Sequence, residues 1–288
     1  MTVALPLSPK REAINLARLW RIAQGNTFPI NAGVLAQEWS RNTVPEAPIE
    51  ELYAKELNGF EGGLFLLKER KVWALIYNPH QGTPGRSNFT IAHEFGHYVL
   101  HRRLQQEFSC SQNSTLGFTN KKIEQEADIF ASYLLMPIDD FSQQVQGQRI
   151  TLQLLSVCAS RYGVSLTAAI LKWLEFTDQA AIAVMGREGM LHWWKASDCA
   201  KKYGFEFLRQ GMELPSLALA SNPNFIVQED REGVDHSKGV WFPDIATREM
   251  LIVSDRYDMT ISLLLLDPPG AQIKEDPIND LTNTLPRF

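Results

Sequence analysis

Apolar residues in the first 175 positions recur mostly at the spacing of amphipathic helices. This periodicity predicts four helices, over Arg11–Ala23, Asn31–Trp39, Thr90–Arg103 and Lys121–Leu135. Two short helices are expected after them, up to Glu175. The apolar run Lys71–Tyr77 predicts a strand, and Gly62–Leu67 is expected to pair with it through a turn at residues 68–70.

Strand patterns dominate beyond residue 176. Two apolar segments, Ala181–Met185 and Met190–Trp194, flank a turn with two glycines, which predicts a β-hairpin. A helix is expected over Asp198–Gln210. Three further strands are expected, at Gly239–Phe242, Met250–Ser254 and Thr260–Leu266. The change of pattern predicts a domain boundary near residue 176.

The charge distribution changes at the same place. Residues 1–175 carry 17 basic and 16 acidic side chains, whereas residues 176–288 carry 11 and 17. The net charge of the chain is −5, and this acidic balance argues against direct nucleic-acid binding. The longest apolar runs, such as Leu263–Leu266, are far shorter than the ~20 residues of a membrane span, so no membrane partner is expected. Three widely spaced cysteines and an N-terminus unlike a signal peptide predict reduced thiols and a cytoplasmic location.

The segment His93-Glu94-Phe95-Gly96-His97 has the pattern H-E-x-x-H. Positions four apart on a helix differ by about 40° in direction, so both imidazoles face the same way and can share one Zn²⁺. Glu94 is then placed to act as general base on a water bound to that metal. Because so short a pattern also arises by chance on an ordinary helix, its surroundings decide its meaning.

Those surroundings favour a metal site. Asn88 or Thr90 is expected to cap the helix just ahead of the motif. Gly96 costs a helix interior ~1 kcal/mol relative to Ala, which is explained if another backbone packs closely there. A zinc peptidase site also needs a strand beside the metal helix to hold an extended peptide. The strand 71–77 is the candidate, with Trp73 and Leu75 as substrate-binding residues.

A third ligand is expected from the helix 121–135. Its apolar side chains form one arc, and Glu124 falls inside that arc, roughly 50° from the centre, while Glu126 lies about 110° away. A carboxylate directed into a core is costly unless it is paired or binds a metal, so Glu124 is the favoured ligand. Asp128, one turn later, is placed to accept a hydrogen bond from a ligand imidazole. The alternative is that Glu124 is a helix-start charge and Asp128 its solvated neighbour.

Other histidines and tyrosines near the motif have weaker claims. His101 continues the row of His93 and His97, but the rotation of the helix carries it away from the metal, which favours an outer or surface role. Three histidines are interpreted as surface or loop residues: His80, His192 and His236. Three tyrosines are candidates for polarising a substrate carbonyl, although packing is the favoured role of each: Tyr77, Tyr98 and Tyr133.

Residues 150–176 contain a helix-turn-helix-like pattern. A helix over Leu152–Ser160 and another over Leu166–Leu174 are separated by a turn that contains Gly163. The second helix holds a single basic residue, Lys172, and almost no side chain able to contact base edges. Packing or docking of a partner protein is therefore favoured over DNA reading.

Two segments extend the metal motif. The first is Arg86-x-x-Phe89-Thr90-x-Ala92-His93-Glu94-x-Gly96-His97-x-x-Leu100-His101. The second is Glu124-x-x-Ala127-Asp128-x-Phe130-Ala131-x-x-Leu134-Leu135-Met136-Pro137. In this order and at this separation they resemble the ImmA/IrrE family of zinc metallopeptidases, over roughly residues 28–175. Both segments together are far more specific than H-E-x-x-H alone.

The resemblance implies a gluzincin-like site in which His93, His97 and Glu124 bind Zn²⁺ and Glu94 is the general base. It also implies a regulatory role, because family members cleave a helix-turn-helix repressor and so switch on stress or mobile-element genes. Some relatives carry a fused N-terminal repressor-like domain. This chain shows none, so the expected target is a separate protein.

These observations together predict an α+β protein with three parts. Residues 1–149 are expected to form a mostly helical, zincin-like metallopeptidase domain with a short β-sheet, residues 150–176 the helix-turn-helix-like segment, and residues 177–288 a mixed α/β domain. The leading functional prediction is a cytoplasmic zinc endopeptidase. The alternative is a catalytically silent regulator that binds a repressor or DNA through residues 150–288 and uses the metal site structurally. The presence of Glu94 favours the enzyme, because a decayed enzyme is expected to lose its general base first.

Overall fold

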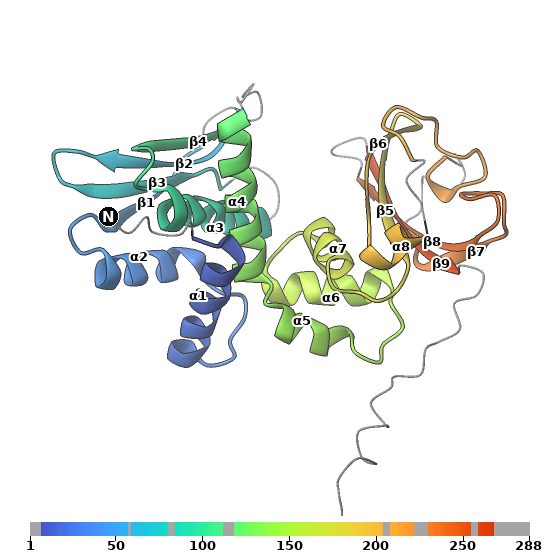
Figure 1. Cartoon of the computed structure of the whole chain (residues 1–288), viewed down its shortest axis with the longest axis horizontal. Helices are drawn as coiled ribbons and strands as arrows, with labels where there is room; N and C mark the ends of the chain where they lie inside the picture. Colours follow the sequence, from blue (N-terminus) through green and yellow to red (C-terminus); the bar gives the residue numbers. More distant parts are fainter. Residues whose placement is uncertain are drawn as a thin grey trace, which may run out of the picture. The chain divides into compact units, whose positions relative to one another are not determined.

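The computed structural model describes residues 7–56, 59–79, 84–111, 118–203, 208–221, 230–254 and 259–267. The chain divides into two compact units, Met1–Phe176 and Thr177–Phe288 (Figure 1). Both units contain a β-sheet, and helices are concentrated in the first unit, so the chain is an α+β protein. Each unit is described by itself.

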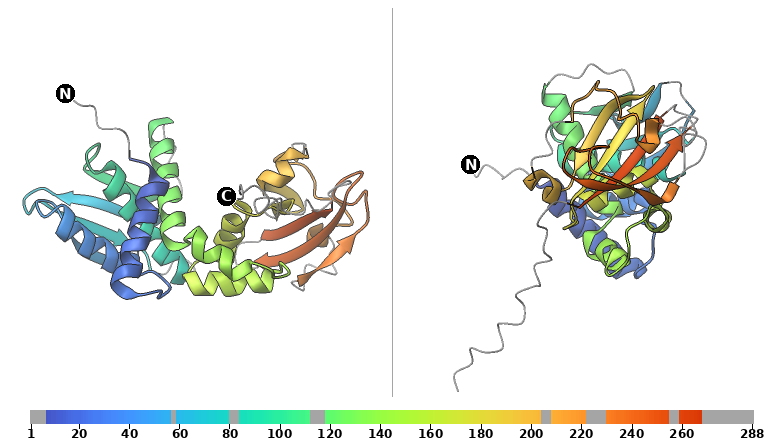
Figure 2. Two further views of the ribbon diagram at one scale, coloured as in Figure 1. Left: turned by 60° about the horizontal axis from the view of Figure 1, so that its bottom comes forward. Right: turned by 90° about the vertical axis from the view of Figure 1, so that its right-hand side faces the viewer.

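The first unit contains helices α1 (Pro9–Gln24), α2 (Ala32–Thr43), α3 (Pro84–His101), α4 (Phe118–Leu135), α5 (Ile138–Val145), α6 (Leu152–Tyr162) and α7 (Leu166–Leu174). Its strands are β1 (Ile49–Ala54), β2 (Phe60–Leu67), β3 (Val72–Tyr77) and β4 (Glu107–Ser111). They form one sheet in the order β1-β3-β2-β4, in which only the β1–β3 pair is parallel. Helix α2 packs against β1 and α3 against β2 and β3, while α1 and α4 lie side by side (Figures 1 and 2).

The predicted helices α1, α2 and α4 and the β2–β3 hairpin are confirmed within a few residues. Helix α3 begins at Pro84, six residues before the predicted start at Thr90, so neither Asn88 nor Thr90 caps it. The Asn88 side chain instead bridges two elements. Its Oδ1 accepts a hydrogen bond from the Ala32 amide at 3.3 Å, and its Nδ2 donates to the Ile30 carbonyl at 3.0 Å. Asn88 therefore ties the start of α2 to α3.

The predicted close approach at Gly96 is confirmed. A Cβ atom on Gly96 would lie 3.3 Å from the Ala127 Cα and 3.0 Å from the Phe130 Cδ1 of α4. The Phe95 and Phe130 rings pack edge to face beside it, with centroids 5.6 Å apart. Small residues at the crossing thus let α4 lie directly against α3, which brings the acidic side chains of α4 to the histidines of α3.

The α6–α7 pair is a packing element. Its turn contains Gly163, whose left-handed backbone (φ 60°) allows the chain to reverse. A Cβ atom on Gly85, at the start of α3, would lie 2.8 Å from the Gly163 carbonyl oxygen, so the turn meets α3 backbone to backbone. Helix α7 is largely buried and offers no free face for a DNA groove. Among the described residues no single helix has the length and hydropathy of a membrane span, and α6 and α7 reach them only as a pair bent by 106°.

The second unit is built on an antiparallel sheet in the order β6-β5-β9-β8-β7. Its strands are β5 (Ala181–Arg187), β6 (Met190–Ala196), β7 (Asp230–His236), β8 (Ala246–Ser254) and β9 (Met259–Asp267). Its described residues also form a short α-helix, α8 (Asp198–Lys202), and a 3₁₀ helix, η1 (Leu219–Ser221). The β5–β6 hairpin is as predicted. The helix expected over Asp198–Gln210 ends at Lys202, and the strand expected at Gly239–Phe242 is reduced to an isolated bridge between Phe242 and Ile245.

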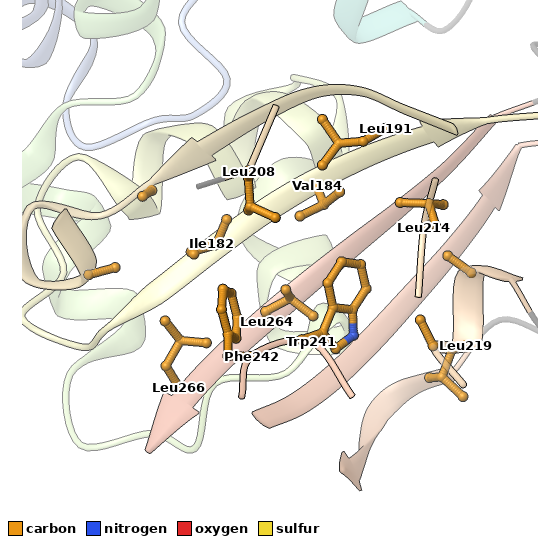
Figure 3. Packing of buried hydrophobic residues seen from close by; sticks show 14 of the residues in the cluster. Ile182, Val184, Leu191, Leu208, Leu214, Leu219, Trp241, Phe242, Leu264 and Leu266 are labelled. Atoms are coloured by element: carbon orange, nitrogen blue, oxygen red, sulfur yellow. The ribbon is translucent and has the colours of Figure 1, made fainter. Parts of the chain in front are cut away.

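One face of this sheet carries an apolar core in which Ile182, Val184 and Leu264 pack with Trp241 and Phe242 (Figure 3). A fully buried carboxylate, Glu249 of β8, lies beside the Trp241 indole. It accepts four hydrogen bonds, from His236 Nε2 (2.9 Å), Trp241 Nε1 (2.9 Å), Ser262 Oγ (2.6 Å) and the Leu219 amide (3.0 Å). Burial alone raises the pKa of Glu249, but these hydrogen bonds outweigh it and hold the pKa below its ordinary value. The interpretation of His236 as an unremarkable surface or loop histidine is therefore wrong.

Candidate metal centre

Helices α3 and α4 bring three ligand-type side chains together. His93 and His97 lie one turn apart on α3, with their Nε2 atoms 3.0 Å from each other. Glu124 of α4 approaches both, with its Oε2 3.1 Å from His93 Nε2 and its Oε1 3.4 Å from His97 Nε2. One ligand atom from each residue lies within 4.8 Å of the others. Both histidines are buried and Glu124 is half-buried, so the cluster opens to solvent on the side of the carboxylate.

The donor set fits a divalent metal ion. Asp128 Oδ1 lies 2.9 Å from His93 Nδ1, and a carboxylate only accepts, so a His93 imidazole that binds a metal through Nε2 can keep its proton on Nδ1 and donate it to Asp128. With the proton there, the Nε2 lone pair of His93 would point to the place where the Nε2 of His97 and the carboxylate of Glu124 also converge. A divalent cation could bind all three groups at the point where they converge, and two imidazoles with one carboxylate are a common ligand set of catalytic zinc.

The protonation states of His97 and Glu124 also fit a site for a metal ion. Burial lowers the pKa of His97 to about 4, so this imidazole is neutral at neutral pH. Burial alone raises the pKa of Glu124, but hydrogen bonds to His93 and His97 outweigh it and hold the pKa well below its usual range. A metal binds neutral imidazole and ionised carboxylate, so neither group has to lose a proton first at neutral pH.

Glu94 lies at the same site without being part of the ligand cluster. Its side chain is fully buried, and it faces a cavity of about 220 Å³. The cavity is lined by Glu61, Phe89, Thr90, His93, Glu94, Glu124 and Asp128. A carboxylate next to a metal position and facing the same cavity is placed to exchange a proton with a molecule bound there.

Comparison with known families identifies this part of the chain. Residues 50–174, which run from β1 to the end of α7 and include every residue of the cluster, match the IrrE N-terminal-like domain, Peptidase_M78. This segment belongs to that family. The resemblance to the ImmA/IrrE family expected from the two motifs is confirmed.

The remaining comparisons concern the whole chain. No curated protein sequence matches it. Among solved structures it is similar to a Mycobacterium tuberculosis transcriptional regulator, with a TM-score of 0.55 and 14% sequence identity over 88% of this chain and 75% of that one. At that identity the likeness concerns the fold alone.

A second layer of polar residues surrounds the cluster in the IrrE N-terminal-like domain. Asp128, as described, contacts His93. His101 Nδ1 lies 3.2 Å from His97 Nδ1, and His101 Nε2 lies 2.9 Å from Glu126 Oε2. His101 is almost fully buried, and burial lowers its pKa. Glu126 has no role predicted from the sequence, because this residue lies away from the apolar arc of its helix.

Two expectations about substrate contacts are wrong. Strand β3 lies between β1 and β2 and has no free edge, so the run Lys71–Tyr77 cannot pair with an extended substrate. The side chains of Trp73 and Leu75 are 2% and 0% exposed and belong to the core. A short apolar strand in the middle of a sheet has the same composition as an apolar edge strand, and only its pairing distinguishes the two.

The three tyrosines considered for the substrate carbonyl lie elsewhere in the IrrE N-terminal-like domain. Tyr98 is buried and donates its hydroxyl to the Ala47 carbonyl at 2.7 Å. Tyr133 packs beneath the ammonium groups of Lys10 and Lys172, and Tyr77 lines a separate groove beside α2. None of the three lines the cavity at Glu94. Their favoured role as packing residues is consistent with these positions.

Gly62 of β2 leaves room for Glu94. A Cβ atom at this position would overlap the Thr90 methyl group and lie 3.1 Å from Glu94 Oε1. We expect Gly62→Ala to displace Glu94 and to lower kcat by about tenfold or more, since small misplacements of a reacting group are costly. Zinc content should stay unchanged, because all three ligands come from helices. Both quantities are measured on the purified protein.

The matched control for this variant removes the overlap by shortening Thr90 instead of restoring Gly62. Thr90→Ser deletes the methyl group that the new Cβ would strike, so the double variant should regain part of the lost activity. No recovery in the double variant, together with normal zinc content, would contradict the steric explanation.

Proposed function

We propose that this chain is a zinc-dependent endopeptidase of regulatory type, which hydrolyses a peptide bond in a helix-turn-helix transcriptional repressor. The observation that carries the proposal is the convergence of His93, His97 and Glu124 beside the buried carboxylate of Glu94. Membership of residues 50–174 in a peptidase family supports it.

Each residue of the cluster has a role in this reaction. A bound zinc ion would supply positive charge that acidifies a water molecule and polarises a peptide carbonyl. His93, His97 and Glu124 hold the ion, and Asp128 fixes the tautomer and ring orientation of His93. Glu94 accepts the proton of the attacking water and returns it to the amine of the leaving peptide.

Strand β4 replaces β3 as the proposed substrate strand. It lies at the edge of the sheet and pairs with β2 along one side. Its partner β2 carries Gly62 next to Glu94, so an extended peptide added to this edge would run near the cavity. Main-chain pairing supplies affinity without reading sequence.

A transcriptional repressor is the proposed substrate on two grounds. The ImmA/IrrE resemblance implies one, and one solved structure with a similar fold is described as a transcriptional regulator. The same neighbour also fits the alternative, a catalytically silent regulator that binds a repressor or DNA through residues 150–288. The burial of α7 weighs against direct DNA reading by the helix pair.

The test identifies small helix-turn-helix proteins encoded by the genes that neighbour the gene of this chain, and incubates each with the full-length chain loaded with one equivalent of zinc. We expect cleavage at one position, detected by mass spectrometry, and no cleavage by His97→Ala, which loses a ligand. Tight binding of the repressor without cleavage under the same conditions would favour the silent regulator instead.

A further inference from the structure

A buried row of polar groups leads away from the proposed metal position. His97 Nδ1 lies 3.2 Å from His101 Nδ1, and His101 Nε2 lies 2.9 Å from Glu126 Oε2. The side chains of His97 and His101 are 0% and 3% exposed, whereas Glu126 is 30% exposed and ends the row near solvent. The row therefore runs from the cluster through the helix interface to the surface of α4.

When a metal binds His97, only one arrangement of protons lets every contact in this row be a hydrogen bond. If His97 Nε2 binds a metal, that nitrogen is bare and His97 carries its proton on Nδ1. The neighbouring Nδ1 of His101 must then accept, so His101 carries its own proton on Nε2. That proton points at Glu126, whose carboxylate only accepts. The acceptor-only group at the end of the row thus fixes the tautomer of both histidines.

The ring planes are fixed as well. Phe108 of β4 stacks on His97, with centroids 4.6 Å apart and planes 17° from parallel, and lies 6.2 Å from the His101 ring. His93 reaches its orienting carboxylate, Asp128, directly, and that carboxylate is 59% exposed. The Nδ1 side of His97 reaches its carboxylate, Glu126, through a second, buried histidine.

We propose that His101 and Glu126 are positioning residues that hold His97 in the tautomer and orientation of a metal ligand. This inference rests on the proposed zinc site. The inference extends that site by giving two more residues a role in supporting His97. They are His101, one turn beyond H-E-x-x-H, and Glu126, two residues beyond the proposed third ligand.

Zinc affinity tests the proposal on the full-length chain, by competition with a chromophoric chelator. Loss of an outer partner of a ligand histidine costs about 10- to 100-fold in metal affinity, and we expect losses of this size for His101→Phe and Glu126→Ala. His101→Asn keeps an acceptor oxygen near the position of Nδ1, and Glu126→Gln keeps one near Oε2. Both should retain most of the affinity. Lys122→Ala is the matched control, because Lys122 lies on the same helix 3.8 Å from Glu126 and is exposed.

The tautomers of His97 and His101 provide an independent test, because they would not change in the variants if Glu126 had only a structural role. Two-bond ¹⁵N–¹H correlations should show His97 protonated on Nδ1 and His101 on Nε2 in the zinc-loaded wild type. In Glu126→Ala the His101 signal should shift towards a mixture of tautomers, while the thermal unfolding of the protein stays nearly the same.

Two results would overturn the proposal: wild-type zinc affinity in both His101→Phe and Glu126→Ala, or a His101 protonated on Nδ1 in the loaded protein. Equal losses for His101→Asn and His101→Phe would also count against the hydrogen-bonded row and indicate packing instead. A wild-type chain that binds no zinc would overturn the metal site itself, and this inference with it. Normal zinc binding without peptidase activity would overturn the proposed function alone.

Discussion

Replacing Glu94 by Gln should leave the zinc content and fold unchanged and lower repressor cleavage by on the order of a hundredfold or more. The reason is positional. Glu94 shares the cavity with His93 and Glu124 but is not one of the three converging ligands. Gln occupies the same volume and can still accept a hydrogen bond, but it cannot take a proton from water. The measurement is the single-turnover rate, alongside elemental analysis for zinc.

The matched control is Glu61→Gln, which removes another carboxylate from the lining of the same cavity. Glu61 forms an ion pair with Arg86, and we expect its loss to change the rate only slightly. Wild-type cleavage by Glu94→Gln would contradict the mechanism. Equal losses in the two variants would show that the cavity depends on its total negative charge rather than on one base.

The residues of the candidate metal site were predictable because their convergence depends on local geometry. An i,i+4 spacing places His93 and His97 on one face of any helix, wherever that helix packs. Glu124 was found because a carboxylate inside an apolar arc needs a partner. Gly96 predicted the close crossing that brings the two helices together, and the structure shows that crossing, at Ala127 and Phe130 of α4.

The surroundings of the site were not predictable in the same way. Strands β1 (Ile49–Ala54) and β4 (Glu107–Ser111) have short, partly polar sequences, and their pairing with distant strands is what makes them strands. The sequence pattern predicts neither β1 nor β4, and a sheet without β1 has β3 at its edge. This is why the wrong strand was predicted to bind the substrate. Glu126 was missed for a related reason: its partner, His101, belongs to another helix.

In the second unit, the pattern of apolar residues also failed to predict the strand and the buried hydrogen bonds that polar residues form. Strand β7 (Asp230–His236) contains five charged or histidine side chains in seven positions, and no apolar alternation marks it as a strand. Its His236 donates to Glu249, which also links β9 and the turn at Leu219. One buried carboxylate and its hydrogen-bond donors can therefore help to specify a fold where the pattern of apolar and polar residues predicts no strand.

Glu249 should accordingly dominate the stability of the second unit. Glu249→Met removes every acceptor and leaves the donors from His236, Trp241, Ser262 and Leu219 opposite a thioether. We expect this to lower the free energy of unfolding of the unit by on the order of 3 kcal/mol or more. Glu249→Gln should cost less, because its carbonyl oxygen can face three of the donors while its amide donates to the Ser262 hydroxyl.

Acidification should separate the contribution of the charge from that of the hydrogen bonds. The pKa of Glu249 is lowered in the folded state, so its ionised form stabilises the fold above the ordinary pKa of about 4.5. That contribution is lost as the pH falls through the lowered pKa. The difference between wild type and Glu249→Gln should therefore begin to shrink as the pH falls below about 4.5, and it should be smallest below the lowered pKa, where Glu249 of the folded protein is neutral as well.

Hydrogen exchange of peptides from β8 and β9 measures this local stability directly. The exposed Glu232→Gln is the matched control and should exchange like the wild type at every pH. Zinc content should not change in either Glu249 variant, since the ligands belong to the first unit. Exchange in Glu249→Met as slow as in the wild type would mean that the apolar core formed by Ile182, Leu264 and their neighbours holds the sheet without the buried carboxylate.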